Sequence, residues 1–282
     1  MRLTPLPDIM IEPLVRNALL EDLGRAGDVT TDAIIPQSKQ WKGALVARQD
    51  GVVAGLDLAR MAFQLIDPKV RFDVKKADGS TIKPKDVLAV MSGSAASIIT
   101  AERVALNFLC HMSGVATATR QLVDAVKPHK TRICCTRKTT PGLRAIEKYA
   151  VRAGGGGNHR FGLDDAVLIK DNHVAVAGGV TQAVKLVRAQ VGHLVKIELE
   201  VDTLDQLREA LTLPIDAVLL DNMEPAMLKK AVGLVKGRFT TEASGRVNAT
   251  IAPAIAASGV DLISCGWITH SAPILDIGLD EG

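Results

Sequence analysis

Six short apolar runs follow residue 130, and they constrain the fold more than any other feature of the chain. Amphipathic segments such as TLDQLREAL and PAMLKKAVGLV lie between most of the runs. Buried strands that alternate with helices are typical of βα units and a parallel sheet. Since six units are many for a small open sheet, the pattern predicts an incomplete (β/α) barrel. The predicted strands span residues 132–136, 166–170, 195–200, 216–221, 239–242 and 261–265.

The first 110 residues have a different pattern, which predicts a separate α+β domain. Residues 12–24 predict a helix, and an acidic loop is expected after it. Two apolar runs flank the Asp-Gly pair at 50–51, which predicts a β-hairpin, and a second Asp-Gly pair at 78–79 precedes a strand-rich segment. From Thr100 the apolar residues recur with a helical period, and Thr100 is the expected N-cap. We expect the domain boundary inside this helix or just after it.

The composition excludes several classes of partner. The chain has 34 basic and 31 acidic residues, so no overall field favours nucleic acid or an anionic membrane. Two Trp, one Tyr and five Phe offer few platforms for base stacking. No uncharged apolar run reaches 18 residues, and proline and acidic residues interrupt the apolar N-terminal stretch, so neither a membrane span nor a signal peptide is expected. The four cysteines form no CxxC pair, which predicts reduced thiols and a cytoplasmic location.

Charged residues at the ends of the predicted strands indicate where the active site lies. Barrel enzymes build their sites at the carboxyl ends of the strands. The first four strands are followed or ended by Arg137 with Lys138, then Lys170, Glu200 and Asp221. A single charged residue at a strand end often has no functional role, because loops are polar and exposed to solvent. A polar group at all six ends predicts a site.

Two basic loops predict an anionic ligand. The segment TRKTTPG at 136–142 holds two cations and three hydroxyls, and a run of four glycines at 154–157 precedes Asn158, His159 and Arg160. Arginine can grip a carboxylate with two hydrogen bonds, whereas lysine suits phosphate as a point charge. The loops therefore indicate a small molecule with several negative charges. The alternative is a flexible glycine hinge with basic residues on the surface.

Glu200 and Asp221 admit three interpretations at this stage. They could hold Mg²⁺ on a diphosphate or bind ribose hydroxyls, they could be a general acid and base, or they could only neutralise nearby cations. The segments EASG at 242–245 and SCG at 264–266 offer backbone N–H groups and hydroxyls at the last two strands, where barrels often bind phosphate. Nucleotide-binding glycine motifs are absent, and the six histidines lack the spacing of a zinc site.

Several of these segments, in this order, resemble the quinolinate phosphoribosyltransferase family, also called nicotinate-nucleotide pyrophosphorylase (carboxylating). The resemblance covers nearly the whole chain and is most specific over residues 136–173. The matching segments are EDLGRAGDVTTDAIIP (21–36), TRKTTPGLRAIEKYAVRAGGGGNHRFGLDDAVLIKDNH (136–173), LEVDTLDQLREAL (199–211), LLDNM (219–223), EASG (242–245) and THSAPILDIGL (269–279).

This resemblance implies a type II phosphoribosyltransferase fold. Residues 1–113 would form the N-terminal α+β domain, joined by the tail 272–282, and residues 114–271 the catalytic barrel. It further implies a Mg²⁺-dependent transfer from phosphoribosyl diphosphate to quinolinate with decarboxylation, which yields nicotinate mononucleotide, CO₂ and diphosphate in the de novo synthesis of NAD. The expected assembly is a homodimer, or a hexamer built from dimers, with shared active sites.

The resemblance also assigns roles to single residues on the quinolinate side. Arg137, His159 and Arg160 would contact the quinolinate carboxylates, with Lys138 nearby. Arg103 lies off the apolar stripe of its predicted helix, and on that pattern alone it is a solvated charge. The resemblance implies instead that Arg103 reaches the active site of the other subunit.

On the phosphoribosyl side, the resemblance brings Lys170, Glu200 and Asp221 to phosphoribosyl diphosphate and its Mg²⁺. Lys138 and these three residues are the expected catalytic groups, and the two carboxylates are the expected metal ligands, directly or through substrate or water. Four residues from the last two strand ends would surround the 5′-phosphate: Ser244, Gly245, Gly266 and His270.

Three alternatives remain on sequence grounds. The first is another phosphoribosyltransferase of the same fold, either a nicotinate salvage enzyme or the molybdenum-locus relative, although the intact TRK and LIKDNH segments favour quinolinate. The second is an aldolase-type barrel with Lys170 as a Schiff-base lysine. The third is a non-catalytic protein that senses a phosphosugar. Glu200 and Asp221 make this less favourable, since a protein that only binds an anion has little use for two carboxylates facing its ligand.

Overall fold

A computed structural model describes residues 3–282 of the chain, which form two compact units. Of the described residues, the first unit contains 3–120, 145–155 and 271–282, and the second contains 121–144 and 156–270. The boundary predicted after residue 113 falls inside the long helix α4 (Ala95–Ala125).

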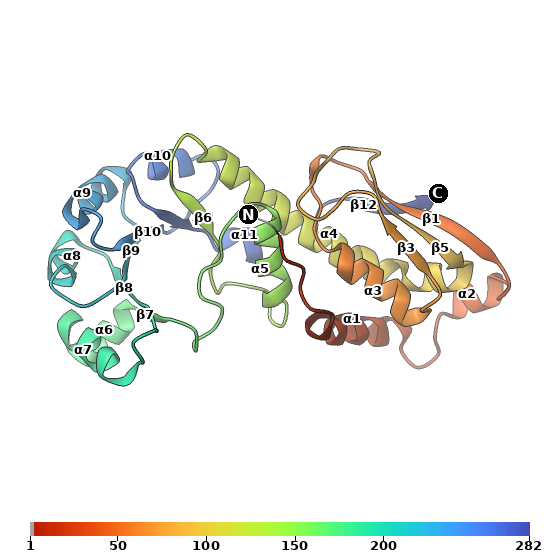
Figure 1. Ribbon diagram of the computed structural model, residues 1–282, viewed down its shortest axis with the longest axis horizontal. Coiled ribbons are helices and arrows are strands. Elements are labelled where there is room, and N and C mark those ends of the chain that lie inside the picture. The colour runs from red at the N-terminus through yellow and green to blue at the C-terminus, as the bar shows by residue number, and fades with distance from the viewer. Residues whose placement is uncertain (1–2) are drawn as a thin grey trace. The chain divides into compact units, whose positions relative to one another are not determined.

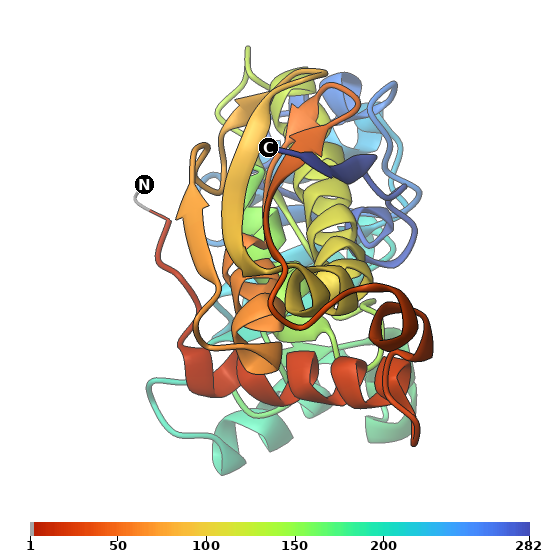
Figure 2. The same cartoon turned by 90° about the vertical axis from the view of Figure 1, so that its right-hand side faces the viewer.

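The first unit is an α+β domain built on a four-stranded antiparallel sheet in the order β12-β1-β5-β3. The last strand of the chain, β12, lies at one edge of this sheet beside β1 (Figure 2). A separate pair, β2 with β4, completes the strands of this unit. Its elements are α1 (Asp8–Leu23), α2 (Val29–Ile34), β1 (Gln40–Ala47), β2 (Gly51–Val52), α3 (Leu56–Ile66), β3 (Arg71–Val74), β4 (Thr81–Ile82), β5 (Val87–Ser94), most of α4, α5 (Arg144–Ala153) and β12 (Ile277–Glu281).

The hairpin predicted at Asp50-Gly51 is wrong. Strand β1 pairs with β12 and β5, while β2 pairs with β4. A two-residue type I′ turn needs positive φ at both central residues, and neither Asp50 nor Gly51 has it. Gly51 serves close packing instead, because a Cβ atom there would lie 2.7 Å from the side chain of Leu275.

Two helix boundaries also differ from the sequence predictions. Helix α4 begins at Ala95 rather than at Thr100, because β5 runs directly into it and Ser94 Oγ accepts the N–H of Ser97 at 3.4 Å, as an N-cap serine does. Thr100 lies inside the helix and donates to Asp28 Oδ2 at 3.0 Å. The expected acidic loop contains the short helix α2, which Asp28 caps by accepting the N–H of Thr31 at 3.0 Å.

The C-terminal segment packs against α4 at a glycine, which gives a test of this arrangement. A Cβ atom on Gly114 would lie 2.1 Å from the carbonyl oxygen of Pro273. We therefore expect Gly114→Ala to lower the free energy of unfolding by at least about 2 kcal/mol, as overpacking of a core does. In contrast, Gly233 lies inside helix α9 (Pro225–Val235) with no atom within 4 Å of an added Cβ.

Gly233→Ala is the matched control and should stabilise the protein by about 0.5–1 kcal/mol, because alanine restricts the unfolded chain. Chemical denaturation of both variants measures the two effects. Equal stability of Gly114→Ala and the wild type would contradict the close approach of α4 and residue 273.

The second unit contains the six parallel strands that the apolar runs predict. Their order in the sheet is β6-β11-β10-β9-β8-β7, and helices α7, α8 and α9 lie on the outer side of the curved sheet (Figure 1). The elements are the end of α4, β6 (Arg132–Cys134), β7 (Val167–Ile169), α6 (Asp171–Ala177), α7 (Val180–Gln190), β8 (Ile197–Val201), α8 (Leu204–Ala210), β9 (Ala217–Asp221), α9, β10 (Thr240–Ser244), α10 (Ala252–Ala256), β11 (Leu262–Ser264) and α11 (Trp267–His270).

The sheet is an incomplete barrel, as predicted. The first strand of the unit, β6, pairs with the last, β11, while β6 and β7 are not paired. The segment after α5 pairs with β6 through a single bridge between Cys134 and Gly157. The open side of the barrel therefore lies between β6 and β7. Over residues 3–282, we find no helix with both the length and the apolar character that a bilayer span requires.

Candidate active site

A cavity of about 370 Å³ lies at the carboxyl ends of the barrel strands, where the sequence predicts the site. Eleven polar or charged side chains line it, and they come from the ends of all six strands or the loops after them and from the segment that precedes β7. The lining residues are Thr136, Arg137, Lys138, His159, Arg160, Leu168, Lys170, Glu200, Leu219, Asp221, Glu242, Ser244 and Ser264. The structure thus brings together eight of the twelve predicted site residues in one cavity.

Arg137 and Arg160 are the most informative pair in the cavity. The Nε atom of each is buried and has no hydrogen-bond partner among the described residues. Burial lowers the pKa of Arg160, and the neighbouring charge of Arg137 lowers it further. Two half-buried guanidinium groups that repel each other, each with a buried Nε donor left unused, are suited to bind anionic oxygens.

The glycine run positions His159 and Arg160 by close packing. A Cβ atom on Gly154 would lie 2.4 Å from the carbonyl oxygen of Ala116, and Gly155 has a φ of 93°. The N–H of Gly157 then donates to the Ile133 carbonyl at 2.8 Å, which fixes the segment along β6. A larger residue at position 154 would displace the chain that carries both side chains. Gly154 and Gly155 are therefore fixed within the first unit, and Gly157 is fixed along β6 in the second.

Glu200 and Asp221 end the neighbouring strands β8 and β9. Burial raises the pKa of Glu200, and the charge of Asp221 raises it further, while Lys170 acts in the opposite direction. Asp221 Oδ2 also accepts a hydrogen bond from Asn222 Nδ2 at 2.5 Å. Two carboxylates this close to each other, with one pKa raised by the other, offer the oxygen ligands that Mg²⁺ prefers.

The residues assigned to the phosphate divide into two groups. Ser244 lines the cavity, whereas Gly245, Gly266 and His270 do not. Gly245 has a φ of 108° and packs against Asn222, where a Cβ atom would lie 2.2 Å from Oδ1. Gly266 lies beside Lys138 and His270, because its Cβ would lie 2.9 Å from Lys138 Cδ and 3.3 Å from His270 Cδ2. These contacts place Gly266 and His270 next to a residue that lines the cavity.

Arg103 lies on α4 in the first unit, and its side chain is exposed. The cavity residues all belong to the second unit. Arg103 is therefore not part of the cluster that the barrel itself assembles. Its predicted role in the active site of a second subunit stays a prediction.

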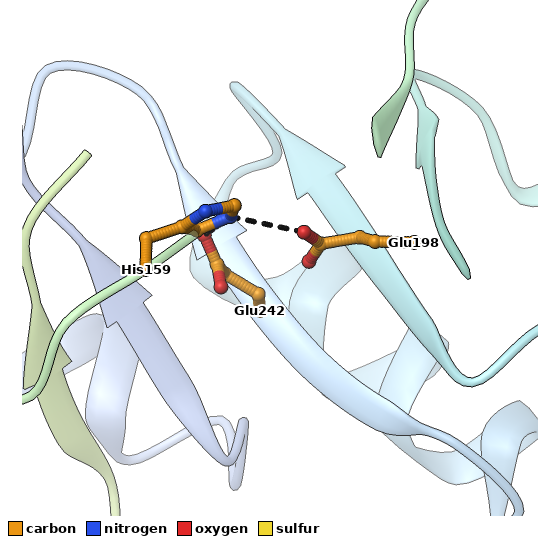
Figure 3. A group of neighbouring side chains, drawn as sticks. All are labelled: His159, Glu198 and Glu242. Carbon is orange, nitrogen blue, oxygen red and sulfur yellow. Dashed lines mark hydrogen bonds and ion pairs between the residues drawn. The ribbon is translucent and has the colours of Figure 1, made fainter. Parts of the chain in front are cut away.

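The sequence analysis missed two glutamates that face His159. His159 Nε2 lies 3.0 Å from Glu198 Oε2 and 3.6 Å from Glu242 Oε1, and Figure 3 shows the Glu242 side chain beside the ring, with the hydrogen bond to Glu198 as a dashed line. Potential ligand atoms of the three residues lie within 4.8 Å of one another. A period-two pattern could have revealed them, because Glu198 and Glu200 share one face of β8, and Glu242 and Ser244 share one face of β10.

Comparisons with known proteins agree with this fold. The family models described as quinolinate phosphoribosyl transferase, N-terminal domain and C-terminal domain, match residues 28–113 and 115–280. The chain is 41% identical to the probable nicotinate-nucleotide pyrophosphorylase [carboxylating] of Bacillus subtilis, over 96% of this chain and 93% of that protein. It is 42% identical to the chloroplastic nicotinate-nucleotide pyrophosphorylase [carboxylating] of Arabidopsis thaliana, over 97% of this chain and 83% of that one.

Among solved structures, NadC from Streptococcus pyogenes is 39% identical, with a TM-score of 0.95 and coverage of 99% of both chains. The fold is thus that of the type II phosphoribosyltransferases, an incomplete barrel with an N-terminal α+β domain. Within that class, the chain belongs to the quinolinate phosphoribosyltransferase family.

Proposed function

We propose that the protein transfers the phosphoribosyl group of phosphoribosyl diphosphate to quinolinate and releases CO₂, with nicotinate mononucleotide and diphosphate as the other products. The observation that carries this proposal is the neighbouring pair of Arg137 and Arg160, whose buried Nε donors have no partner among the described residues. Two adjacent guanidinium groups match the two adjacent carboxylates of quinolinate. The names of the relatives support the same reaction.

Binding by these arginines orients the substrate for the first step. With both carboxylates held, the pyridine nitrogen lies ready to attack C1 of the ribose and to displace diphosphate through an oxocarbenium-like state. Well-oriented reactants gain up to about 7–11 kcal/mol from such positioning. Lys170 and Lys138 would neutralise charge on the diphosphate, while Ser244, Gly245, Gly266 and His270 would hold the 5′-phosphate.

Glu200 and Asp221 are the residues that would hold Mg²⁺. Their oxygens fit the ion because the two carboxylates lie close enough for one to raise the pKa of the other. When bound, Mg²⁺ neutralises negative charge on the diphosphate as it leaves. Glu200, which lines the cavity, would also stabilise the positive charge that develops on the sugar.

The second step follows from the first. The pyridinium formed by transfer withdraws electrons from C2, so that the adjacent carboxylate leaves as CO₂. The same arginines would discriminate against nicotinate, since its single carboxylate leaves a buried cation unpaired.

Parallel assays with quinolinate and nicotinate test the reaction. Purified protein with Mg²⁺ and phosphoribosyl diphosphate should form nicotinate mononucleotide from quinolinate and none from nicotinate. Turnover of nicotinate alone would indicate a salvage enzyme of the same fold. A borohydride-trapped adduct on Lys170 would instead favour an aldolase-type barrel.

The role of Glu200 can be separated from substrate binding. We expect Glu200→Gln to lower kcat by about 10²-fold and to change the Kd of quinolinate by less than about threefold, because the carboxylate acts on the transition state and the metal. The raised pKa of Glu200 predicts that the apparent affinity for Mg²⁺ falls as the pH decreases, from a higher pH than for an ordinary glutamate.

Stopped-assay kinetics and isothermal titration of quinolinate measure the two effects. The matched control is Glu209→Gln on α8, where an exposed glutamate binds Thr181 and no cavity residue is altered. A loss of quinolinate affinity equal to the loss of kcat would contradict the assigned role.

A further inference from the structure

Glu242 is a buried acid that opens onto the active-site cavity. The side chain comes from the middle of β10 and is 2% exposed. It lines the cavity of about 370 Å³ at the carboxyl ends of the strands, and it also lines a second cavity of about 480 Å³ among their opposite ends. Glu242 therefore lies between the two cavities, at the floor of the active site.

One oxygen of Glu242 is left without a hydrogen bond. Oε1 has no hydrogen-bond partner among the described residues, and His159 Nε2 lies 3.6 Å from it. The carboxyl group also has a hydrogen bond with the Ser264 side chain and a weak contact from Cys134 Sγ to Oε2 at 3.9 Å. A buried carboxylate with one oxygen that lacks a donor is costly, whereas a protonated carboxyl group lowers that cost.

The groups around Glu242 favour this protonated form. His159 directs Nε2 mainly to Glu198, at 3.0 Å, while its Nδ1 accepts the N–H of Arg160 at 2.7 Å, so both ring nitrogens are engaged within the protein. Burial raises the pKa of Glu242 to about 7, the charge of Glu198 raises it and His159 opposes the shift. Near neutral pH a large share of the molecules therefore keeps a proton on Glu242 that an exposed glutamate has lost.

We propose that Glu242 is the acid that delivers the proton to C2 of the pyridine ring after CO₂ has left. This inference rests on the proposed function, because that reaction creates the need for a proton. Loss of CO₂ breaks the bond between C2 and the carboxyl carbon and leaves the electron pair on C2. A new C2–H bond forms with the proton of Glu242, which becomes a carboxylate. Water returns a proton to Glu242 after product release, and no oxidant or reductant is required.

The neutral form of Glu242 is suited to both stages of the reaction. While the dicarboxylate binds to Arg137 and Arg160, a protonated Glu242 adds no negative charge near its carboxylates. After CO₂ leaves, the carbanion at C2 is far more basic than a carboxylate, so the proton moves toward C2. His159 and Glu198 would act as positioning residues. The hydrogen bond between them fixes the His159 ring beside the carboxyl group of Glu242.

Single-turnover experiments with Glu242→Gln test the proposal. Glutamine keeps the volume of the side chain and removes the acidic proton. The rate of diphosphate release should stay within about fivefold of wild type, while nicotinate mononucleotide should form about 10²-fold more slowly, in line with the usual contribution of a general acid. The dicarboxylate nucleotide should accumulate before product appears, which chromatography of quenched samples detects.

Two further variants make the result specific. Glu242→Asp keeps an acid at this position and should restore part of the rate of product formation. Glu147→Gln is the matched control, because Glu147 is another fully buried glutamate beside a histidine, with His111 Nε2 at 3.0 Å, and it does not line the cavity. It should leave the ratio of diphosphate release to product formation unchanged.

The pH dependence provides an independent readout. Since Glu242 must be protonated to act, the single-turnover rate of product formation in the wild type should fall as the pH rises through about 7. The ionisable or charged groups that face Glu242 and Glu198 are His159, Cys134 and Arg160. These groups are still present in Glu242→Gln. If the fall in rate above about pH 7 disappears in this variant, the fall is due to Glu242.

Three results would overturn the proposal. The first is a Glu242→Gln enzyme that forms nicotinate mononucleotide at the wild-type rate, and the second is an equal loss of diphosphate release and product formation. The third is a stoichiometric transition metal in the purified wild type that Glu242→Gln lacks, since His159, Glu198 and Glu242 would then be metal ligands. Failure of the proposed function looks different, because the wild type itself would then release no diphosphate with quinolinate.

Discussion

Replacement of Arg160 by methionine is expected to lower kcat/KM for quinolinate by about 10³-fold and to leave the protein at least as stable as the wild type. Methionine fills much of the volume of arginine but carries no charge. Activity falls because a charge-assisted contact to a carboxylate is lost. Stability does not fall, because the variant removes the repulsion between Arg160 and Arg137 and one unpaired buried donor. The hydrogen bond from Arg160 Nη1 to the Ala166 carbonyl, at 2.9 Å, offsets part of this gain.

Two controls separate charge from geometry in this prediction. Arg160→Lys keeps the charge without the planar fork, and we expect it to recover only a small part of the activity. Arg208→Met removes an exposed arginine that pairs with Asp205 on α8, and it should change neither activity nor stability measurably. Steady-state kinetics and thermal denaturation measure the effects. A variant at position 160 that is both fully active and less stable would show that Arg160 is structural.

Arg103→Ala and Arg137→Ala should each be inactive alone and should recover activity when combined in mixed dimers. We propose that the protein is a homodimer in which Arg103 of the partner subunit completes the quinolinate site. The exposure of Arg103 supports this proposal, because the side chain is a cation that does not line the cavity of its own barrel. An equal mixture of the two variants should regain about one quarter of the wild-type activity, because half of the dimers are mixed and each of these holds one complete site.

Co-expression of the two variants with different tags isolates the mixed dimers. Purified mixed dimers should have about half of the wild-type activity, again because one of two sites is complete. The control combines Arg103→Ala with Arg103→Lys, for which no site regains the native arginine. Absence of recovery in the Arg103–Arg137 pair, in a preparation that is dimeric, would contradict a shared active site.

The sequence predicts the barrel well because each of its strands is buried on both faces. Such strands appear as short apolar runs, and all six are confirmed as β6 to β11 within a few residues. The N-terminal predictions fail where long-range pairing decides the structure. Asp50-Gly51 has the local signature of a turn, but β1 finds its partners in β5 and in β12, more than 200 residues away in the chain.

The site is predictable to a similar degree and for similar reasons. Charges at strand ends stand out from apolar runs, so Lys170, Glu200 and Asp221 can be found from the sequence. Glu198 and Glu242 are harder to interpret, because they lie inside strands and their proximity to His159 arises only when the barrel closes. The repulsion between Arg137 and Arg160 also depends on the bridge that holds the glycine segment along β6.

The central claim is that phosphoribosyl transfer makes the decarboxylation possible, and quinolinate labelled with ¹⁴C in its 2-carboxylate tests it most directly. The protein is mixed with labelled quinolinate and Mg²⁺, with and without phosphoribosyl diphosphate, and the released CO₂ is counted. The account predicts one labelled CO₂ for each nicotinate mononucleotide formed, and none without phosphoribosyl diphosphate. Release of CO₂ in the absence of phosphoribosyl diphosphate, or transfer to quinolinate that retains the label in the final product, would contradict it.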